Sequence, residues 1–142
     1  MIRVPPPKPT TVYILQCEDR TYYVGKSDDP MKRFEEHKAG TGAAWTKLHP
    51  PIDIYKLYPG SGPFEEDKIT KEMMGKYGID SVRGGSYVTV ELSAAARAAL
   101  QKELWAAKDC CIRCGREGHF VGDCWAGTDV NGKSLRGAFW KR

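Results

Sequence analysis

The sequence TVYILQCEDRTYYVGK, residues 11–26, contains two strand-like segments joined by a short polar turn. Residues 11–17 are rich in β-branched and aromatic side chains, which is typical of a strand buried on both faces. Residues 22–26 predict a second strand. Because only a few polar residues separate the two segments, they are expected to pair as an antiparallel hairpin.

A helix and a third strand are predicted after this hairpin. An Asx residue precedes Pro30, which is typical of a helix start, and the helix is expected to extend to about Lys38. The loop that follows carries Trp45. Residues 52–58 alternate in polarity as a third strand would.

Two more helices are predicted, over residues 64–76 and 93–108. The second begins at Ser93, a good capping residue, and is rich in alanine and leucine. The order of elements predicts an α+β fold with a small three-stranded mixed or antiparallel sheet flanked by helices.

Near the C-terminus the spacing C-x2-C-x4-H-x4-C joins Cys111, Cys114, His119 and Cys124. Three thiolates and one imidazole at this spacing suit a single tetrahedral Zn²⁺ ion. The segment resembles the zinc knuckle of nucleic-acid-binding proteins. Cys110 does not fit the four-ligand spacing and is expected to be a bystander.

These patterns divide the chain into five parts. We expect a proline-rich lead at residues 1–10, a main domain with a C-terminal extension at 11–92, a connecting helix at 93–108, the knuckle at 109–126 and a basic tail at 127–142.

The composition is ordinary for a globular protein, and its mildly basic charge is compatible with a polyanionic partner but not diagnostic of one. The net charge is +4. The number of cysteines, five, is odd, and three of them lie at the spacing of metal ligands, which argues against a secreted disulfide scaffold. No apolar run approaches the length of a membrane span. The sequence therefore predicts an intracellular, reducing location, in the nucleus or cytoplasm and of possible viral origin, without a membrane partner.

One acid on the predicted helix 64–76 faces the core. A helical projection at about 100° per residue places Glu66 within the stripe formed by Ile69, Met73 and Tyr77, and Glu65 beside it. An acid at such a position needs a cation or a metal, because burial of an unpaired charge is costly.

The pair Thr11-Val-Tyr13 and Tyr23-Val-Gly25 resembles the signature of the GIY-YIG nucleases. The spacing from Arg33 to His37 and the loop GTGAAWTKLHPP are similar to the same family, and the resemblance spans about residues 11–77. It implies Mg²⁺-dependent cleavage of a phosphodiester bond.

The resemblance also implies roles for five residues. Glu66 would hold one Mg²⁺ (or Mn²⁺) ion, with Glu65 as the alternative ligand. Tyr13 would position or deprotonate the attacking water with Tyr23 beside it, Arg33 would contact the phosphate, and His37 would share the proton transfer or make a second phosphate contact.

Basic and aromatic residues are expected to contact the nucleic acid, which we expect to be DNA. Dimerisation of the protein on its substrate is a further option. Ile112, Phe120 and Trp125 would either stack on unpaired bases or form the knuckle's own small core. The full set of candidate contacts is Lys26, Trp45, Ile112, Arg113, Arg116, Phe120, Trp125, Lys133 and Arg136.

Two alternatives remain for the function. The main domain would be a catalytically silent module that binds RNA or single-stranded DNA, or the chain would be a zinc adaptor between proteins. A metal-dependent endonuclease with a zinc knuckle is the first hypothesis.

Overall fold

The computed structural model describes residues 10–136 and divides the chain into two compact units, with the boundary between Leu92 and Ser93. Almost all of the proline-rich lead, and the final charges at Lys141 and Arg142, lie outside the described residues. Each unit is described separately.

The N-terminal unit is built on the hairpin of β1 (Thr11–Cys17) and β2 (Thr21–Ser27). The two strands are antiparallel, with Tyr13 opposite Gly25. A three-residue 3-10 turn joins them, and Asp19 in that turn adopts a positive φ of 64°. The hairpin is therefore tight, as the short polar link predicts.

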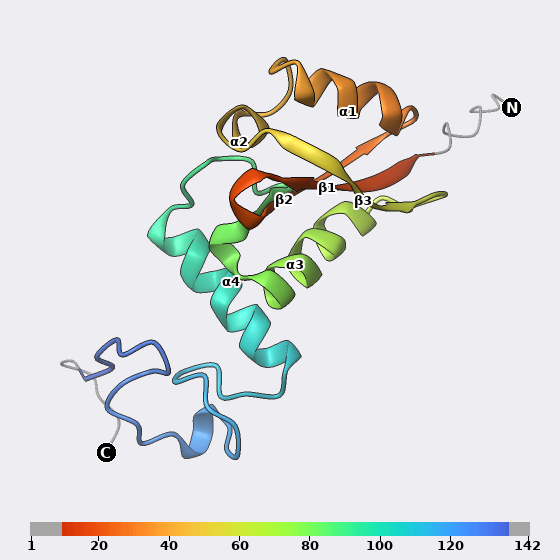
Figure 1. Cartoon of the computed structure of the whole chain (residues 1–142). Helices are drawn as coiled ribbons and strands as arrows, with labels where there is room; N and C mark the ends of the chain where they lie inside the picture. Colours follow the sequence, from red (N-terminus) through yellow and green to blue (C-terminus); the bar gives the residue numbers. More distant parts are fainter. Residues whose placement is uncertain (1–9, 137–142) are drawn as a thin grey trace, which may run out of the picture. The chain divides into compact units, whose positions relative to one another are not determined.

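The sheet has four strands in the order β3-β1-β2-β4, so the prediction of three strands is wrong (Figure 1). β3 (Pro51–Tyr58) is antiparallel to β1, whereas β4 (Val82–Gly84) is parallel to β2. A strand of three residues ending in glycine carries almost no periodic signal. Its pairing depends on close approach, because a Cβ at Gly84 would lie 2.1 Å from the carbonyl oxygen of Val24.

Three helices pack around this sheet. α1 (Pro30–Lys38) begins at Asp29, whose side chain accepts a hydrogen bond from the backbone N–H of Lys32. α2 (Ala44–Leu48) lies within the segment that the sequence predicts as a loop. α3 (Glu65–Tyr77) ends at Gly78, as expected. Figure 1 shows α1 and α3 on opposite sides of the sheet.

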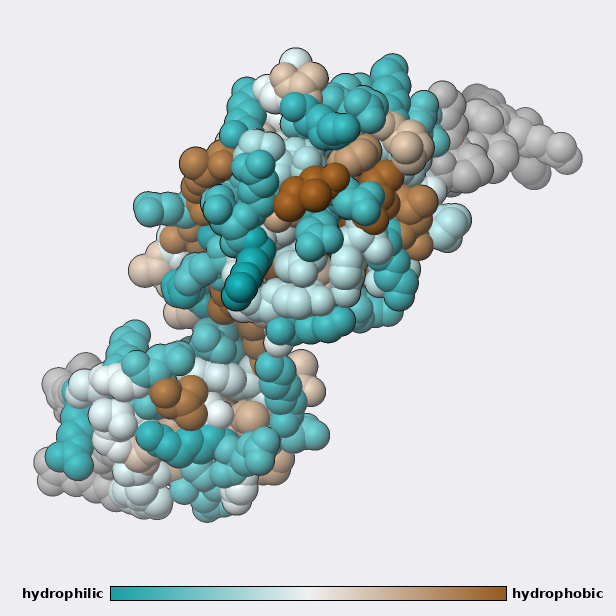
Figure 2. Space-filling view, viewed as in Figure 1, coloured by the Kyte–Doolittle hydropathy of each residue, from teal (hydrophilic) through white to brown (hydrophobic). Residues whose placement is uncertain are grey.

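The core on the α1 side combines strand and helix side chains. Tyr13, Leu15 and Tyr23 from the hairpin pack with Phe34 of α1 and Trp45 of α2. The face of the molecule in Figure 2 is largely hydrophilic, with small hydrophobic areas. No helix within residues 10–136 is both long and apolar enough to cross a membrane.

The C-terminal unit begins with α4 (Ala94–Ala107), which Ser93 caps through a hydrogen bond from the backbone N–H of Ala96. Few regular elements follow: a 3-10 turn at Val121–Asp123 and an isolated bridge between Thr128 and Ser134. Residues 127–136 fold back on the knuckle, since the N–H of Val130 donates to the carbonyl oxygen of Cys114 at 2.8 Å. This part of the expected tail thus belongs to the folded unit.

Candidate active site and metal centre

A buried hydrogen bond joins Tyr13 of β1 to His37 of α1. The tyrosine hydroxyl lies 3.0 Å from Nε2 of His37. On the other side of the ring, Nδ1 lies 2.8 Å from Oγ1 of Thr46, and that hydroxyl lies 3.0 Å from the carbonyl oxygen of Ala43. One imidazole therefore links β1, α1 and α2.

These contacts determine the tautomer of His37. Because the carbonyl oxygen of Ala43 can only accept, the Thr46 hydroxyl donates to it and accepts from Nδ1–H of the imidazole. Nε2 then has a free lone pair, so it accepts the hydrogen bond from the Tyr13 hydroxyl. His37 is thus a neutral ring whose Nε2 is placed to accept a proton.

Two glycines leave space for this pair. A Cβ at Gly25 would lie 2.4 Å from the Tyr13 hydroxyl oxygen, and a Cβ at Gly42 would lie 2.1 Å from Nδ1 of His37. Any larger side chain at either position would displace a ring of the pair. The second tyrosine, Tyr23, is adjacent, with its ring centre 5.0 Å from that of His37.

Burial keeps both groups uncharged at neutral pH. Desolvation, with the neighbouring Tyr23 adding to it, raises the pKa of Tyr13 to about 12. Burial, assisted by the positive charge of Arg33, lowers the pKa of His37 to about 4. The pair therefore rests as a neutral phenol and a neutral imidazole.

Arg33 supplies a positive charge beside the pair. It lies one turn before His37 on α1 and forms an ion pair with Glu36. Its charge also acts against burial at Tyr13, where it lowers the phenol pKa. Arg33 is partly exposed, so its guanidinium is accessible to a ligand from solvent.

Glu66 is a partly buried acid in the first turn of α3. Burial raises its pKa, and the positive charge of Lys26 acts in the opposite direction. Burial is also the main reason that the pKa of Tyr23 is raised, and the charge of Glu66 adds to it. Glu65 instead lies 3.9 Å from Lys68 in an ion pair. Of the two acids, Glu66 is the one whose charge raises the pKa of Tyr13 and of Tyr23.

The structure gives Trp45 a different environment from the expected one. Its side chain is only 4% exposed and packs in the core, with the guanidinium of Arg83 4.9 Å from the ring centre. So little of the indole is exposed that the burial of Trp45 argues against the expected contact with nucleic acid. Lys26, by contrast, is exposed at the end of β2.

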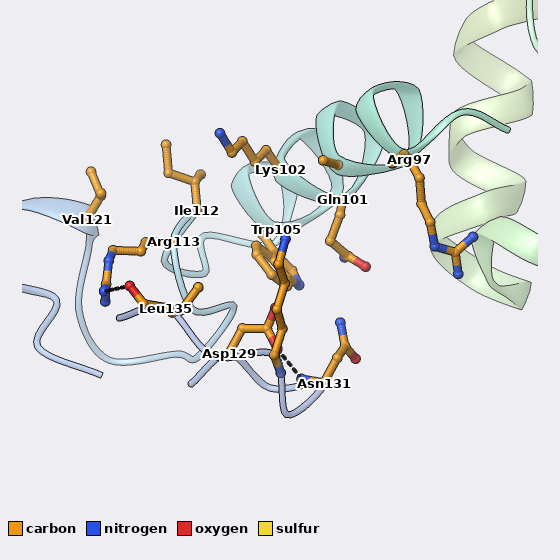
Figure 3. Close-up of a pocket in the computed structure, with 13 residues that line it drawn as sticks. Arg97, Gln101, Lys102, Trp105, Ile112, Arg113, Val121, Asp129, Asn131 and Leu135 are labelled. Atoms are coloured by element: carbon orange, nitrogen blue, oxygen red, sulfur yellow. Dashed lines mark hydrogen bonds between the residues drawn. The ribbon is translucent and has the colours of Figure 1, made fainter. Parts of the chain in front are cut away.

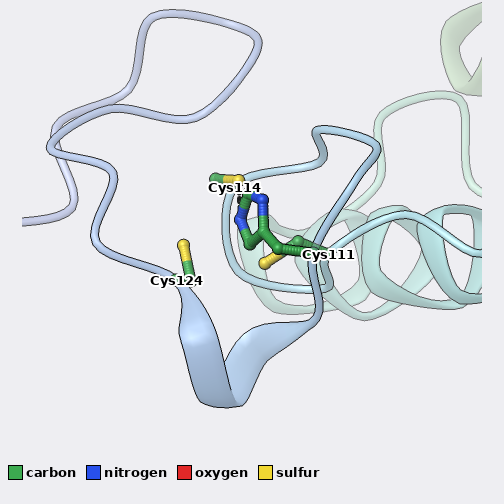
Figure 4. Close-up of side chains that lie close together, drawn as sticks. Cys111, Cys114 and Cys124 are labelled. Atoms are coloured by element: carbon green, nitrogen blue, oxygen red, sulfur yellow. Dashed lines mark hydrogen bonds between the residues drawn. The ribbon is translucent and has the colours of Figure 1, made fainter.

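The four predicted zinc ligands lie together (Figure 4). The ligand atoms of Cys111, Cys114, His119 and Cys124 are all within 4.8 Å of one another. Gly115 has a φ of +82°, and its N–H donates to the carbonyl oxygen of Cys111 at 2.7 Å, which closes the turn. Three thiols and an imidazole at such distances fit a tetrahedral metal ion.

The two knuckle arginines are held by backbone carbonyls. Arg113 donates from Nη1 to the carbonyl oxygen of Ala126 at 2.8 Å and from Nη2 to that of Leu135 at 3.2 Å. Arg116 donates from Nη1 to the carbonyl oxygen of Thr128 at 2.7 Å. Both side chains therefore tie the knuckle to residues 126–135, and only Arg116 remains exposed.

The other expected contact residues of this unit are exposed. Phe120 and Trp125 are 64% and 58% exposed, so they present faces to solvent. This favours the stacking interpretation over a shared small core for these two aromatics. Ile112, Lys133 and Arg136 are exposed as well.

Several important residues were not anticipated from the sequence. Thr46 orients the imidazole, yet it lies in the loop motif already quoted for the resemblance.

Arg83 is buried, and its guanidinium donates to four carbonyl oxygens, those of Ile79, Val82, Thr89 and Val90. Asp129 is buried and accepts from the backbone N–H of Asn131 and of Lys133, both at 2.9 Å. Neither buried charge follows a local sequence pattern.

Residues 9–72 match the family model of the GIY-YIG catalytic domain. This range includes all five predicted catalytic residues. No solved structure matches the chain.

Curated relatives are similar to part of the chain. A UPF0213 protein of Xanthomonas campestris pv. campestris is 40% identical over 53 residues, which cover 37% of this chain and 52% of that protein. A UPF0213 protein of Fusobacterium nucleatum is 40% identical over 47 residues, covering 33% and 47%, and one of Halobacterium salinarum is 42% identical over 43 residues, covering 30% and 56%. The chain spans about half the length of the curated relatives it matches.

The unit that contains Tyr13, His37 and Glu66 is therefore similar, over residues 9–72, to the GIY-YIG catalytic domain.

Proposed function

We propose that this domain hydrolyses phosphodiester bonds of DNA with a single divalent metal ion, Mg²⁺ or Mn²⁺, and that the C-terminal unit helps to bind the substrate. The chain of hydrogen bonds from Tyr13 through His37 to Thr46 carries the proposal. In it a neutral imidazole, which can accept a proton, is hydrogen-bonded to a tyrosine hydroxyl. A purely structural tyrosine does not need this arrangement.

Glu66 is the proposed ligand of the divalent ion. Its carboxylate is partly buried and its pKa is raised by burial, so a cation at this place would remove an energetic penalty. When bound, the ion would stabilise the charge that develops on the phosphate and on the leaving 3′ oxygen.

Tyr13 and His37 are proposed to move the proton of the attacking water. The water would give its proton to the Tyr13 oxygen while the Tyr13 proton passes to Nε2 of His37, 3.0 Å away. His37 would become the imidazolium and Tyr13 would stay neutral. This relay avoids a free phenolate, which the pKa of about 12 makes costly.

Arg33 is proposed to bind the phosphate oxygens, which suit its planar group of donors. In this structure the guanidinium is paired with Glu36, which would orient it until a phosphate replaces or shares that contact. Tyr23, next to the imidazole ring, would restrict how the water approaches.

The C-terminal cluster is proposed to hold one structural Zn²⁺ ion and to act as a nucleic-acid-binding knuckle. Its thiols bind the metal only when reduced, which supports a reducing intracellular location. A single active site cuts one strand at a time, so cleavage of both strands would need two passes or two copies on the substrate.

The test is conversion of supercoiled plasmid to the nicked form in Mg²⁺, with EDTA as the control. Glu66→Gln should remove nicking but leave DNA affinity near the wild-type value, because the amide keeps the shape and loses the charge. Glu65→Gln is a matched control on the preceding residue, and it should nick normally, since Glu65 is paired with Lys68. Full activity in Glu66→Gln would show that the metal site is elsewhere.

The second candidate is a catalytically silent module that binds nucleic acid. The ion pair between Arg33 and Glu36 favours it, because a guanidinium bound to a carboxylate is less available to stabilise the charge that develops on a reacting phosphate. This candidate predicts salt-dependent binding without nicking of any plasmid, single-stranded or branched DNA substrate in Mg²⁺ or Mn²⁺.

A further inference from the structure

We propose that a cavity in the C-terminal unit binds one unpaired nucleobase of a single-stranded segment. The cavity has a volume of about 590 Å³ and lies between α4 and the loops of the knuckle (Figure 3). Its size is in the range of sites that enclose small ligands. The binding role is independent of catalysis, and only its consequence for cleavage rests on the proposed nuclease function.

Apolar side chains provide a stacking surface. Trp105 of α4 lines the cavity together with Ile112 and Leu135. The backbone of Gly115 lies directly against the indole, since a Cβ there would lie 2.5 Å from Cε2 of Trp105. An indole beside branched aliphatic groups is the kind of surface on which an unpaired base stacks.

Two amide side chains border the same cavity. Gln101 extends from α4 and Asn131 from the loop that follows the knuckle (Figure 3). Each amide offers a donor and an acceptor, which is what the hydrogen-bonding edge of a base requires. The loop of Asn131 is held in place, since its backbone N–H donates to Oδ1 of Asp129 at 2.9 Å.

The charge around the cavity suits a polyanion. Four cationic residues line it, Arg97, Lys102, Arg113 and Lys133, against a single acid, Asp129. That acid is buried and accepts two backbone hydrogen bonds, so the exposed rim is basic. Phosphates on either side of an inserted base would meet the exposed Arg97, Lys102 and Lys133, whereas Arg113 is already bound to backbone carbonyls. This favours a nucleic acid over an apolar peptide, which would gain nothing from the cations.

A base can enter this cavity only when it is not stacked and paired in a duplex. The inference therefore specifies the substrate class: nucleic acid that contains an unpaired segment. A nuclease with this unit would prefer gapped, flapped or branched DNA to an intact duplex.

The experiment measures fluorescence anisotropy of the full-length protein with a labelled short single-stranded DNA and with the blunt duplex of the same sequence, at one salt concentration. We expect tighter binding to the single strand. Trp105→Leu should lower that affinity about tenfold, as loss of one stacked base does, and Gln101→Ala should lower it several-fold. Neither should change duplex affinity by as much.

Lys102→Ala should also weaken binding and reduce its salt dependence, whereas Lys108→Ala, at the residue that follows the same helix and not at the cavity, should do neither. Gln101→Ala and Lys102→Ala alter exposed or half-exposed side chains, so they test the cavity even if Trp105→Leu loses its fold. Equal affinity for single strand and duplex, or unchanged affinity in Gln101→Ala and Trp105→Leu, would overturn the inference.

Plasmid nicking is measured in parallel so that the two proposals fail separately. Nicking without a preference for single strands refutes the cavity and leaves the nuclease. A preference that depends on Trp105, without nicking of any substrate, supports the cavity and refutes the nuclease.

Discussion

The hydroxyl of Tyr13 and Nε2 of His37, 24 residues apart in the chain, lie 3.0 Å apart in a buried hydrogen bond. Neither residue is charged at neutral pH, and Thr46 fixes which nitrogen accepts the proton. This relationship leads to predictions for catalysis and for stability.

Tyr13→Phe should reduce plasmid nicking by about 10²- to 10⁴-fold, the usual contribution of a positioned acid–base group. DNA affinity should stay near wild type, because the ring and its packing remain. The measurements are nicking in Mg²⁺ and binding by anisotropy. Tyr87→Phe is a control outside the site, and it should nick normally. Wild-type nicking by Tyr13→Phe would remove Tyr13 from the mechanism.

The protein should lose stability as the pH falls from about 6.5 towards 4. The pKa of His37 is lowered to about 4 in the folded state, so between these values the unfolded chain binds more protons and acid favours unfolding. The full effect is at most about 3 kcal/mol. Urea unfolding of wild type and His37→Gln at several pH values measures it. The difference between the two proteins should shrink as the pH falls, and a constant difference would contradict a neutral buried imidazole.

Gly25→Ala should destabilise the N-terminal unit by about 1–3 kcal/mol, because the added Cβ would overlap the Tyr13 hydroxyl at 2.4 Å. Gly62→Ala is the matched control, since nothing lies within 4 Å of a Cβ there. Chemical unfolding compares the two. If both variants unfold at the same denaturant concentration, the close contact between Gly25 and Tyr13 is not present in solution.

Cys114→Ser should abolish binding of one equivalent of Zn²⁺ and weaken nucleic-acid affinity, while the N-terminal unit stays folded. Cys110→Ser is the matched control, because Cys110 is next to the cluster but not part of it. Co²⁺ absorbance reports the thiolate ligands, and far-UV circular dichroism reports the fold. Loss of most of the circular dichroism signal in Cys114→Ser would contradict the two-unit organisation.

Local patterns in the sequence predicted much of this architecture. The hairpin of β1 and β2 and the helix start at Pro30 follow from side-chain type and capping alone. The order of the cysteines and the histidine predicted a cluster, because the knuckle is a local motif whose geometry depends on few other residues.

Features that depend on distant contacts were not predictable in this way. β4 is three residues long and is defined by its parallel pairing with β2. Trp45 looked like a contact for a base, but Arg83, 38 positions later, covers its ring. Residues 127–136 looked like a free basic arm, because nothing local indicates that Asp129 holds this segment in a turn and that Arg113 binds it to the knuckle.

Arg83 is the clearest case of such a distant contact. Its buried guanidinium donates to four carbonyl oxygens, and it stacks on Trp45, whose neighbour Thr46 orients His37. Lysine at this position has one ammonium group and lacks the planar fork, so it cannot make all of these hydrogen bonds. Arg83→Lys should therefore destabilise the N-terminal unit by about 2–4 kcal/mol.

The same variant should also slow nicking, because a less ordered α2 would no longer hold the Thr46 hydroxyl against Nδ1 of His37. Chemical unfolding measures the first effect, and nicking at a temperature where the variant is folded measures the second. Arg20→Lys, an exposed arginine in the hairpin turn, is the matched control and should change neither. If Arg83→Lys is destabilised but nicks normally, Arg83 supports only the fold; if it has wild-type stability, the four carbonyl contacts do not stabilise this unit.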